Sequence, residues 1–351
     1  MKEKETITFI GAGMIGTALG NILAETGTGN ILLHSIEKDV VKSITETRIN
    51  SRYFPTLQLH PALQATTDNR RLHNSGVIFL AVPSAVLLDY LKSIRQHIPP
   101  GAILVNLAKG FGSEHKTITE CLKEGFPNPV CTLKGPSFAR EIINRLPTGF
   151  TLGYEAPVVE PGKGQGLKNR ALTKNGALSP VPGKITALFN GTNIHLDYTD
   201  DILGVEILSI LKNIFAVALG IIDAHFNSAN LRFLVLTKAF REMRRVLVYF
   251  GGSEDTLFNY CGYGDFTLTA LNDLSRNRTL GLLIGKGFFT EHVSHELVLE
   301  GRTALNIFYE EISKKMNVNK QFPIIAELYK IFDQKYDSIS FVKNILNIEE
   351  P

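Results

Sequence analysis

The chain has 351 residues, of which 44% are hydrophobic, and this length allows roughly two globular domains. Its 37 basic and 34 acidic residues give a net charge of +3, too balanced for a nucleic-acid-binding protein, whose basic residues cluster. Cys121, Cys131 and Cys261 lack metal-ligand spacing and the N-terminus carries no signal-peptide pattern, so we expect no disulfide framework, no metal site and a cytoplasmic location.

The first stretch, Ile7–Gly20, predicts a strand, a glycine turn and a helix. Gly11 permits the tight turn, Gly13 leaves room for a pyrophosphate, and Gly16 lets the helix pack on the strand. The free N–H groups and positive dipole at the start of this helix suit phosphates. Because a second strand follows at Asn30–His34, the stretch indicates a dinucleotide site, although a βα turn without a ligand remains an alternative.

Short apolar runs then alternate with helical patterns, which is typical of a parallel sheet covered by helices. The runs are Gly76–Val82, Ile103–Leu107, Val130–Leu133 and Gly149–Leu152. Ligands of such sheets bind beyond the carboxyl ends of the strands, so we expect a site among Val82–Ser84, Ala108–Gly110 and Lys134–Phe138. The fold class predicted is α/β, with a Rossmann-like N-terminal domain over residues 1–200 and a mostly parallel sheet.

The segment Glu155–Lys184 is rich in glycine, proline and basic residues, which predicts a loop or flexible insertion. Alternation resumes over Ile185–Tyr198, and Thr199–Asp201 supplies capping residues for the helix that follows. We therefore place the domain boundary there.

The stretch Ile202–Ile222 is long and apolar enough to span a membrane. Glu206, Lys212 and Asn213 lie within it, and charges near the centre of a spanning helix are costly, so we predict a core helix instead. The rest predicts an all-α domain over residues 201–351, with helices at Leu203–Ala224, Asn230–Phe250, Asp255–Tyr260, Arg278–Lys286, Glu296–Met316 and Pro323–Phe332.

Two groups in this second domain are candidates for chemistry. Lys212 stands in an almost wholly apolar helix, where a lysine either extends its ammonium to the surface or serves a site. Gly262–Thr269, followed by Ser275–Arg278, brings a carboxylate, hydroxyls and guanidinium groups near one helix start, which suits a phosphate. The alternative is an N-capping aspartate with a solvent-facing arginine pair.

A series of motifs in this order resembles the NAD(P)-dependent glycerol-3-phosphate dehydrogenases of the bacterial type. The motifs are Gly11–Gly16, Asn50–Pro55, Val82–Ser84, Lys109–Gly110, Gly135–Ala139 with Glu141, Leu211–Asn213, Gly264–Asp265, Ser275–Arg278 and Glu300–Gly301. The resemblance implies reversible hydride transfer between a nicotinamide and dihydroxyacetone phosphate, giving sn-glycerol 3-phosphate, the glycerophospholipid precursor. Independently of the resemblance, the apolar C-terminal domain suggests a homodimer. The balanced charge and the polar residues within Ile202–Ile222 predict neither nucleic-acid partners nor stable membrane insertion.

The resemblance further implies the roles of individual residues. Lys212 stabilises the carbonyl oxygen and donates its proton, Lys109 flanks that oxygen, and Asp265 orients Lys212. The substrate contacts fall to Arg276, Asn277, Thr269, Asn213, Gly135 and Ser137. The cofactor contacts fall to Gly11, Gly13, Met14, Ile15, Gly16, Glu37, Pro83, Lys109, Ala139, Arg276 and Glu300.

The cofactor expected is NAD or NADP. Glu37 lies about 20 residues beyond the glycine turn, where an acid bonds the ribose hydroxyls of NAD. Leu33–Lys38 contains no arginine for a 2′-phosphate, and Lys38 and His34 suit that group less well. We therefore expect a modest preference for NADH.

The segment Asn227–Ala239 departs from the family pattern, since Lys238 stands where an arginine is usual and Ala239 where a glycine is usual. Lys134 likewise occupies a position that is usually small and neutral. Two alternatives therefore stay open: a related dehydrogenase of another hydroxy acid or opine, and a catalytically impaired nucleotide-binding paralogue.

Overall fold

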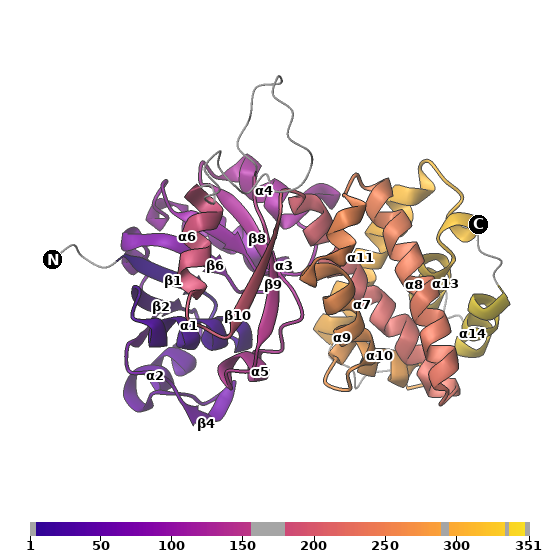
Figure 1. Cartoon of the computed structure of the whole chain (residues 1–351), viewed down its shortest axis with the longest axis horizontal. Coiled ribbons are helices and arrows are strands. Elements are labelled where there is room, and N and C mark those ends of the chain that lie inside the picture. The colour runs from indigo at the N-terminus through magenta and orange to yellow at the C-terminus, as the bar shows by residue number, and fades with distance from the viewer. Residues whose placement is uncertain (1–4, 156–179, 289–294, 334–336, 348–351) are drawn as a thin grey trace, which may run out of the picture. The chain divides into compact units, whose positions relative to one another are not determined.

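The chain forms two compact units, Met1–Ile202 and Leu203–Pro351 (Figure 1). The computed structural model describes residues 5–155, 180–288, 295–333 and 337–347, and for residues 295–300 it describes the backbone alone. The predicted insertion is Glu155–Lys184, and most of it, residues 156–179, lies outside the described residues.

The first unit is a sheet with helices on both faces. Its strands are β1 Thr6–Ile10, β2 Asn30–His34, β3 Ile49–Asn50, β4 Phe54–Gln58, β5 Leu63–Thr66, β6 Ser75–Leu80, β7 Ile103–Asn106, β8 Val130–Lys134, β9 Thr148–Gly153 and β10 Ile194–Thr199. Its helices are α1 Met14–Thr26, α2 Lys38–Thr47, α3 Ser84–Ser93, α4 Ile118–Gly125, α5 Ala139–Ile143 and α6 Pro180–Phe189.

Eight of these strands form one sheet in the order β10-β9-β8-β7-β6-β1-β2-β5. Every pair in it is parallel except β8 with β9. The predicted fold class is confirmed, and the six predicted strands are all present. Because β1, β2, β6, β7 and β8 run in the same direction, the loops after them meet at one edge of the sheet.

One local prediction was wrong, and it concerns the segment before β10. The alternation over Ile185–Tyr198 is divided between α6, which ends at Phe189, and β10, which begins at Ile194. The helix α6 begins at Pro180, inside the predicted loop. Prolines are tolerated in a first helical turn, where the backbone N–H groups have no intrahelical acceptor.

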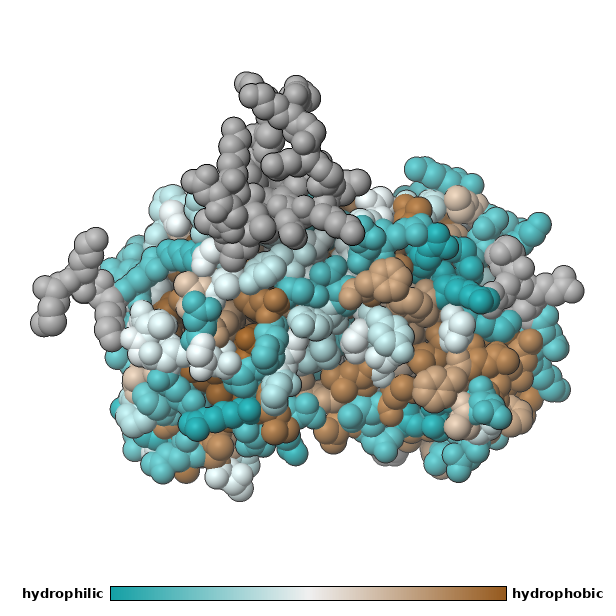
Figure 2. Space-filling model, viewed as in Figure 1, coloured by the Kyte–Doolittle hydropathy of each residue, from teal (hydrophilic) through white to brown (hydrophobic). Residues whose placement is uncertain are grey.

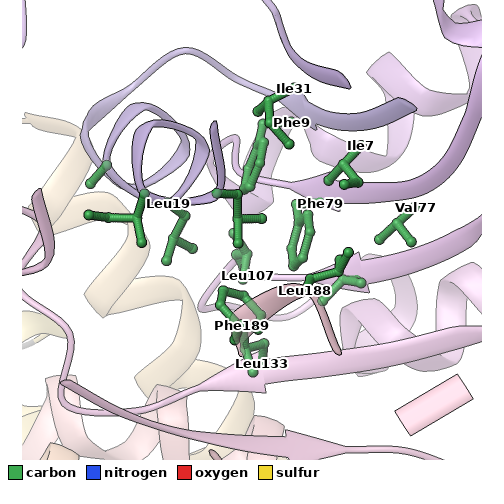
Figure 3. Packing of buried hydrophobic residues seen from close by; sticks show 14 of the residues in the cluster. Ile7, Phe9, Leu19, Ile31, Val77, Phe79, Leu107, Leu133, Leu188 and Phe189 are labelled. Carbon is green, nitrogen blue, oxygen red and sulfur yellow. The ribbon is translucent and has the colours of Figure 1, made fainter. Parts of the chain in front are cut away.

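Apolar side chains fill both faces of this sheet. On the face covered by α1, α5 and α6, Phe9 of β1 and Phe79 of β6 stack with their ring centroids 4.6 Å apart (Figure 3). Phe189 of α6 meets Phe79 edge-on at 6.1 Å. On the other face, Leu87 of α3 and Leu122 of α4 cover a second cluster. Packing on both faces thus holds the strands in place, and with them the loops at their carboxyl ends.

The second unit contains only helices among the residues that the structure describes. They are α7 Ile202–His225, α8 Ala229–Tyr249, α9 Asp265–Leu271, α10 Arg276–Gly285, α11 His295–Ser313, α12 Val318–Gln321, α13 Pro323–Asp333 and α14 Ser338–Asn347. A 3₁₀ turn at Glu254–Phe258 and a π-helical turn at Tyr260–Gly264 lie between α8 and α9. The predicted helix at Asp255–Tyr260 was wrong, because a 3₁₀ turn at Glu254–Phe258 stands there instead.

Helix α7 is the centre of this unit. It is long and apolar enough to span a membrane, but 94% of its most apolar part is buried in the protein. This agrees with the prediction of a core helix. A Cβ atom at Gly281 of α10 would lie 2.1 Å from the Val217 carbonyl oxygen of α7, and one at Gly220 would lie 2.2 Å from the Arg278 carbonyl oxygen. Glycine therefore lets the backbones of α7 and α10 approach directly.

Glu242 of α8 is a buried carboxyl group that caps another helix. It accepts hydrogen bonds from the backbone N–H groups of Ile324 and Ile325, at 3.0 and 2.8 Å, in the first turn of α13. Burial raises the pKa of Glu242 to about 7, although these N–H groups and Arg245 favour the charged form.

Replacement of Glu242 by glutamine should therefore remove part of the pH dependence of stability. Between the ordinary pKa near 4.5 and the raised value near 7, the folded state holds the proton more tightly than the unfolded state. The contribution of Glu242 to the free energy of unfolding consequently falls as pH rises through 7. Urea unfolding at pH 5 and pH 8 gives the free energy of unfolding of the parent and of Glu242→Gln. If the difference between the two proteins is the same at both pH values, the prediction is contradicted.

Candidate active site

The glycine turn after β1 is shaped by backbone contacts. Gly11 has a φ of +110°, and its N–H donates to the His34 carbonyl oxygen of β2 at 2.8 Å. A Cβ atom at Gly11 would lie 2.5 Å from the Ala81 carbonyl oxygen, and one at Gly16 would lie 2.1 Å from the Gly11 carbonyl oxygen. Both positions therefore require glycine for packing alone.

Gly13 differs from its neighbours because a Cβ atom there would meet nothing within 4 Å. Gly13 caps α1 without a side-chain hydrogen bond, and the first turn of α1 contains no acidic residue. Met14 is exposed and Ile15 half-buried. The open side of this turn thus presents helix N–H groups to an anion, which fits the pyrophosphate of a dinucleotide.

The far side of this site is built by the segment Asn50–Pro55. The buried Asn50 amide donates to the Ala12 carbonyl oxygen and to Thr17 Oγ1, both at 2.9 Å, and so ties β3 to the glycine turn. Arg52 forms an ion pair with Glu37, and the Tyr53 hydroxyl lies 3.4 Å from a Glu37 oxygen. Arg52 lies in the motif Asn50–Pro55, but the sequence alone gives it no role, because its contact with Glu37 depends on the fold.

The loops at the carboxyl edge of the sheet hold the other predicted residues of this unit. The exposed Pro83 caps α3, Ser137 Oγ donates to the Gly135 carbonyl oxygen at 2.8 Å, and Ala139 begins α5. Lys109 follows β7 and is half-buried.

The loop that contains Lys109 is held by hydrogen bonds to Asn106, the last residue of β7. Asn106 Oδ1 accepts from the Ala108 N–H at 2.9 Å, and the Asn106 carbonyl oxygen accepts from Lys134 Nζ at 2.9 Å. Lys134, which departs from the family pattern, is thus a buried lysine beneath the strand end that carries Lys109.

In the second unit, the structure brings Lys212, Asp265 and Thr269 together. The Lys212 side chain is only 3% exposed, and its ammonium donates to Asp265 Oδ1 and, at 3.1 Å, to Thr269 Oγ1. Thr269 Oγ1 donates in turn to the Asp265 carbonyl oxygen at 2.7 Å. Lys212 therefore does not extend to the surface, and its charge is compensated by a buried carboxylate. Asn213, the next residue on α7, is half-buried.

Arg276 and Asn277 stand in the first turn of α10. Ser275 Oγ caps this turn by accepting from the Arg278 N–H at 3.3 Å, and the turn contains no acidic residue. Arg276 is exposed and Asn277 half-buried. This helix start can bind a phosphate through its dipole and the guanidinium group together.

Arg278 shows that the alternative of a solvent-facing arginine pair was wrong. Its side chain is buried, and it forms ion pairs with Asp273 and, at 2.8 Å, with Asp223 of α7. Arg278 thus anchors the first turn of α10 on α7. Glu300 lies in α11, and its side chain falls outside the described part of the chain.

A metal centre is not indicated, because no group of three or more histidine, cysteine or acidic side chains could hold an ion among the described residues. The described residues thus offer a buried ammonium with its carboxylate, one basic anion site at the start of α10 and a dinucleotide turn.

Comparison with known proteins gives matches to both units. A family profile described as the N-terminus of NAD-dependent glycerol-3-phosphate dehydrogenase matches residues 6–159, and one described as its C-terminus matches residues 201–343. A protein named glycerol-3-phosphate dehydrogenase [NAD(P)+] from Clostridium botulinum (strain Eklund 17B / Type B) is 32% identical over 336 residues, which are 94% of each chain.

Two further relatives agree with these matches. The protein of the same name from Methanothermobacter thermautotrophicus is 35% identical over 80% of each chain. The crystal structure of glycerol-3-phosphate dehydrogenase from Coxiella burnetii has a TM-score of 0.83 and 26% identity, covering 98% of this chain and 99% of its own.

Proposed function

The chain belongs to the NAD-dependent glycerol-3-phosphate dehydrogenase family, and we infer that it interconverts dihydroxyacetone phosphate and sn-glycerol 3-phosphate. It is an oxidoreductase that acts on a CH–OH group with NAD or NADP, and its product is the glycerophospholipid precursor. The observation that carries this inference in the structure is the buried contact of Lys212 with Asp265 and Thr269.

The nucleotide fits the first unit, because the Gly13 side of the turn is open and the first turn of α1 offers N–H groups. Bound there, a nicotinamide nucleotide supplies or accepts the hydride. The residues that would hold it are those of the glycine turn, with Glu37 beside the ribose and Pro83, Lys109 and Ala139 at the edge of the sheet.

The chain's own groups supply the rest of the reaction. During reduction, negative charge develops on the C2 oxygen of dihydroxyacetone phosphate, and the Lys212 ammonium is assigned to stabilise it and to donate the proton. Asp265 compensates the charge of the ammonium and orients it, while Thr269 holds it from a second side. By the resemblance, Lys109 is assigned to the same oxygen, and Arg276 and Asn277 to the substrate phosphate.

The function is tested by mixing the pure protein with NADH or NADPH and dihydroxyacetone phosphate and following the nicotinamide absorbance. Loss of absorbance only when the substrate is present supports the assignment, and sn-glycerol 3-phosphate should be the product. Absorbance that stays constant with both nucleotides would refute it.

Replacement of Arg276 by alanine should raise the KM for dihydroxyacetone phosphate by roughly tenfold or more, because a charge-assisted, two-pronged contact is lost. Nucleotide affinity should change less than the KM, because most of the assigned cofactor contacts lie in the first unit. Arg244→Ala is a matched control, since Arg244 is an exposed arginine of the same unit that pairs with Glu254 at 2.8 Å. If the unmodified protein reduces phosphate-free dihydroxyacetone equally well, the phosphate site is wrongly placed.

A cytoplasmic homodimer completes the proposal. Cys121, Cys131 and Cys261 are not joined in disulfides, which suits a reducing compartment. Phe233 and Leu234 of α8 are exposed, and brown apolar side chains gather in the area of α8 in Figure 2. Exposed apolar groups of this kind support a contact with a second copy, and light scattering coupled to gel filtration tests it.

A further inference from the structure

The carboxylate of Glu37 is shared by two side chains that come from the segment after β3. Arg52 Nη1 forms an ion pair with Glu37 Oε1, and the Tyr53 hydroxyl lies 3.5 and 3.4 Å from the two carboxylate oxygens. Glu37 lies three residues beyond the end of β2, at the N-cap position of α2, where an acidic side chain can accept the ribose hydroxyls of a bound dinucleotide. A cation therefore stands directly beside the position that distinguishes NAD from NADP.

This cation is held near the nucleotide turn by a fixed backbone. Asn50 binds the Ala12 carbonyl oxygen and Thr17 Oγ1, and its own Oδ1 accepts from the Tyr53 N–H at 3.3 Å. The start of the segment that carries Arg52 is thus fastened to the glycine turn. The Arg52 side chain itself is 57% exposed, and the structure shows it next to the Tyr53 ring, with its guanidinium carbon 5.6 Å from the ring centroid.

A ribose 2′-phosphate at this position would meet the negative charge of Glu37, so it needs a cation that can leave Glu37 or bridge to it. His34 is poorly suited, because burial lowers its pKa and its ring lies against the Tyr90 hydroxyl at 3.3 Å. Lys38 is exposed and offers a single point charge. Arg52 has the planar fork that binds two phosphate oxygens, and its exposure leaves it free to turn.

We propose that Arg52 is the residue that recognises the 2′-phosphate of NADP, exchanging its contact with Glu37 for the phosphate. With NAD, Arg52 stays on Glu37, and the carboxylate accepts the ribose hydroxyl. The Arg52 and Glu37 pair thereby lets one site accept both nucleotides, although no arginine lies in Leu33–Lys38. This proposal rests on the proposed nucleotide site but not on the identity of the second substrate.

The test measures binding without the second substrate. Calorimetry gives the affinities for 2′,5′-ADP and for ADP, and nucleotide fluorescence gives those for NADPH and NADH. Arg52→Ala should weaken 2′,5′-ADP and NADPH roughly tenfold or more, as expected for loss of a charge-assisted pair of hydrogen bonds, and should leave ADP and NADH within about threefold. Arg52→Lys should retain part of the NADPH affinity.

Glu37→Gln provides the reciprocal measurement. It should strengthen 2′,5′-ADP, because it releases Arg52 and removes the opposing charge, and it should weaken NADH. Arg145→Ala is the matched control, since Arg145 is an exposed arginine of the same unit that pairs with Glu25 at 3.1 Å. It should change neither the affinity for 2′,5′-ADP relative to ADP nor that for NADPH relative to NADH.

Equal weakening of ADP and 2′,5′-ADP by Arg52→Ala, or no weakening of either, would overturn the proposal. Failure of the proposed function looks different: a protein that discriminates these nucleotides through Arg52 but leaves dihydroxyacetone phosphate unreduced would refute the function alone. In the unmodified protein, the affinity for NADH relative to that for NADPH also tests the predicted modest preference for NADH.

Discussion

Replacement of Lys212 by methionine should lower kcat by about 10²–10⁴, the range expected when a general acid is removed. The loss of a buried positive charge beside the developing oxyanion acts in the same direction. Nucleotide affinity should stay nearly unchanged, because the resemblance assigns Lys212 to the substrate oxygen and not to the nucleotide.

The structure also predicts a stability cost for this variant. Methionine fits the apolar surroundings, but it leaves Asp265 as a buried carboxylate without its ammonium, and removing one partner of a buried pair costs about 3–5 kcal/mol. A double variant, Lys212→Met with Asp265→Asn, removes that charge and should regain stability without regaining turnover. Turnover per folded molecule within threefold of the parent, in either variant, would end the case for a catalytic lysine.

Replacement of Gly13 by valine should abolish measurable nucleotide binding while the protein still folds. The added side chain enters open space, so no contact within the protein opposes it. It occupies the space that a pyrophosphate needs, and losing two hydrogen bonds to a charged group, at about 1.5–3 kcal/mol each, weakens binding roughly 100-fold or more.

Gly16→Val is the contrasting variant, because its Cβ atom would lie 2.1 Å from the Gly11 carbonyl oxygen. It should lower the melting temperature, whereas Gly13→Val should leave it close to that of the parent. NADH affinity that is unchanged in Gly13→Val would refute the pyrophosphate assignment.

The sequence predicted the sheet because its central strands are buried on both faces and read as unbroken apolar runs. It missed β3 and β4, which form a separate two-stranded sheet, and β5, which is the edge strand of the main sheet. All three are short and have few apolar residues. It also missed α9, because Gly262 and Gly264 stand directly before Asp265 and interrupt the helical pattern.

The site could be predicted only where residues are close in sequence or stand in a recognised motif. The glycine turn is local, so its geometry follows from spacing. The contact between Glu37 and Arg52 joins residues on either side of α2, and Arg278 reaches Asp223 across 55 positions. Such contacts depend on how helices pack, which residue types and periodicity do not specify.

Helix α7 has a consequence for the synthesis of the chain. It leaves the ribosome before α9 and α10, whose Asp265, Phe266 and Gly281 contact it in the finished protein. The end of α10 lies about 60 residues beyond the end of α7. At about 5–20 residues per second, this apolar segment waits roughly 3–12 s for those neighbours. In that interval it has the length and hydropathy of a membrane-spanning helix and lacks the contacts that bury it in the finished protein.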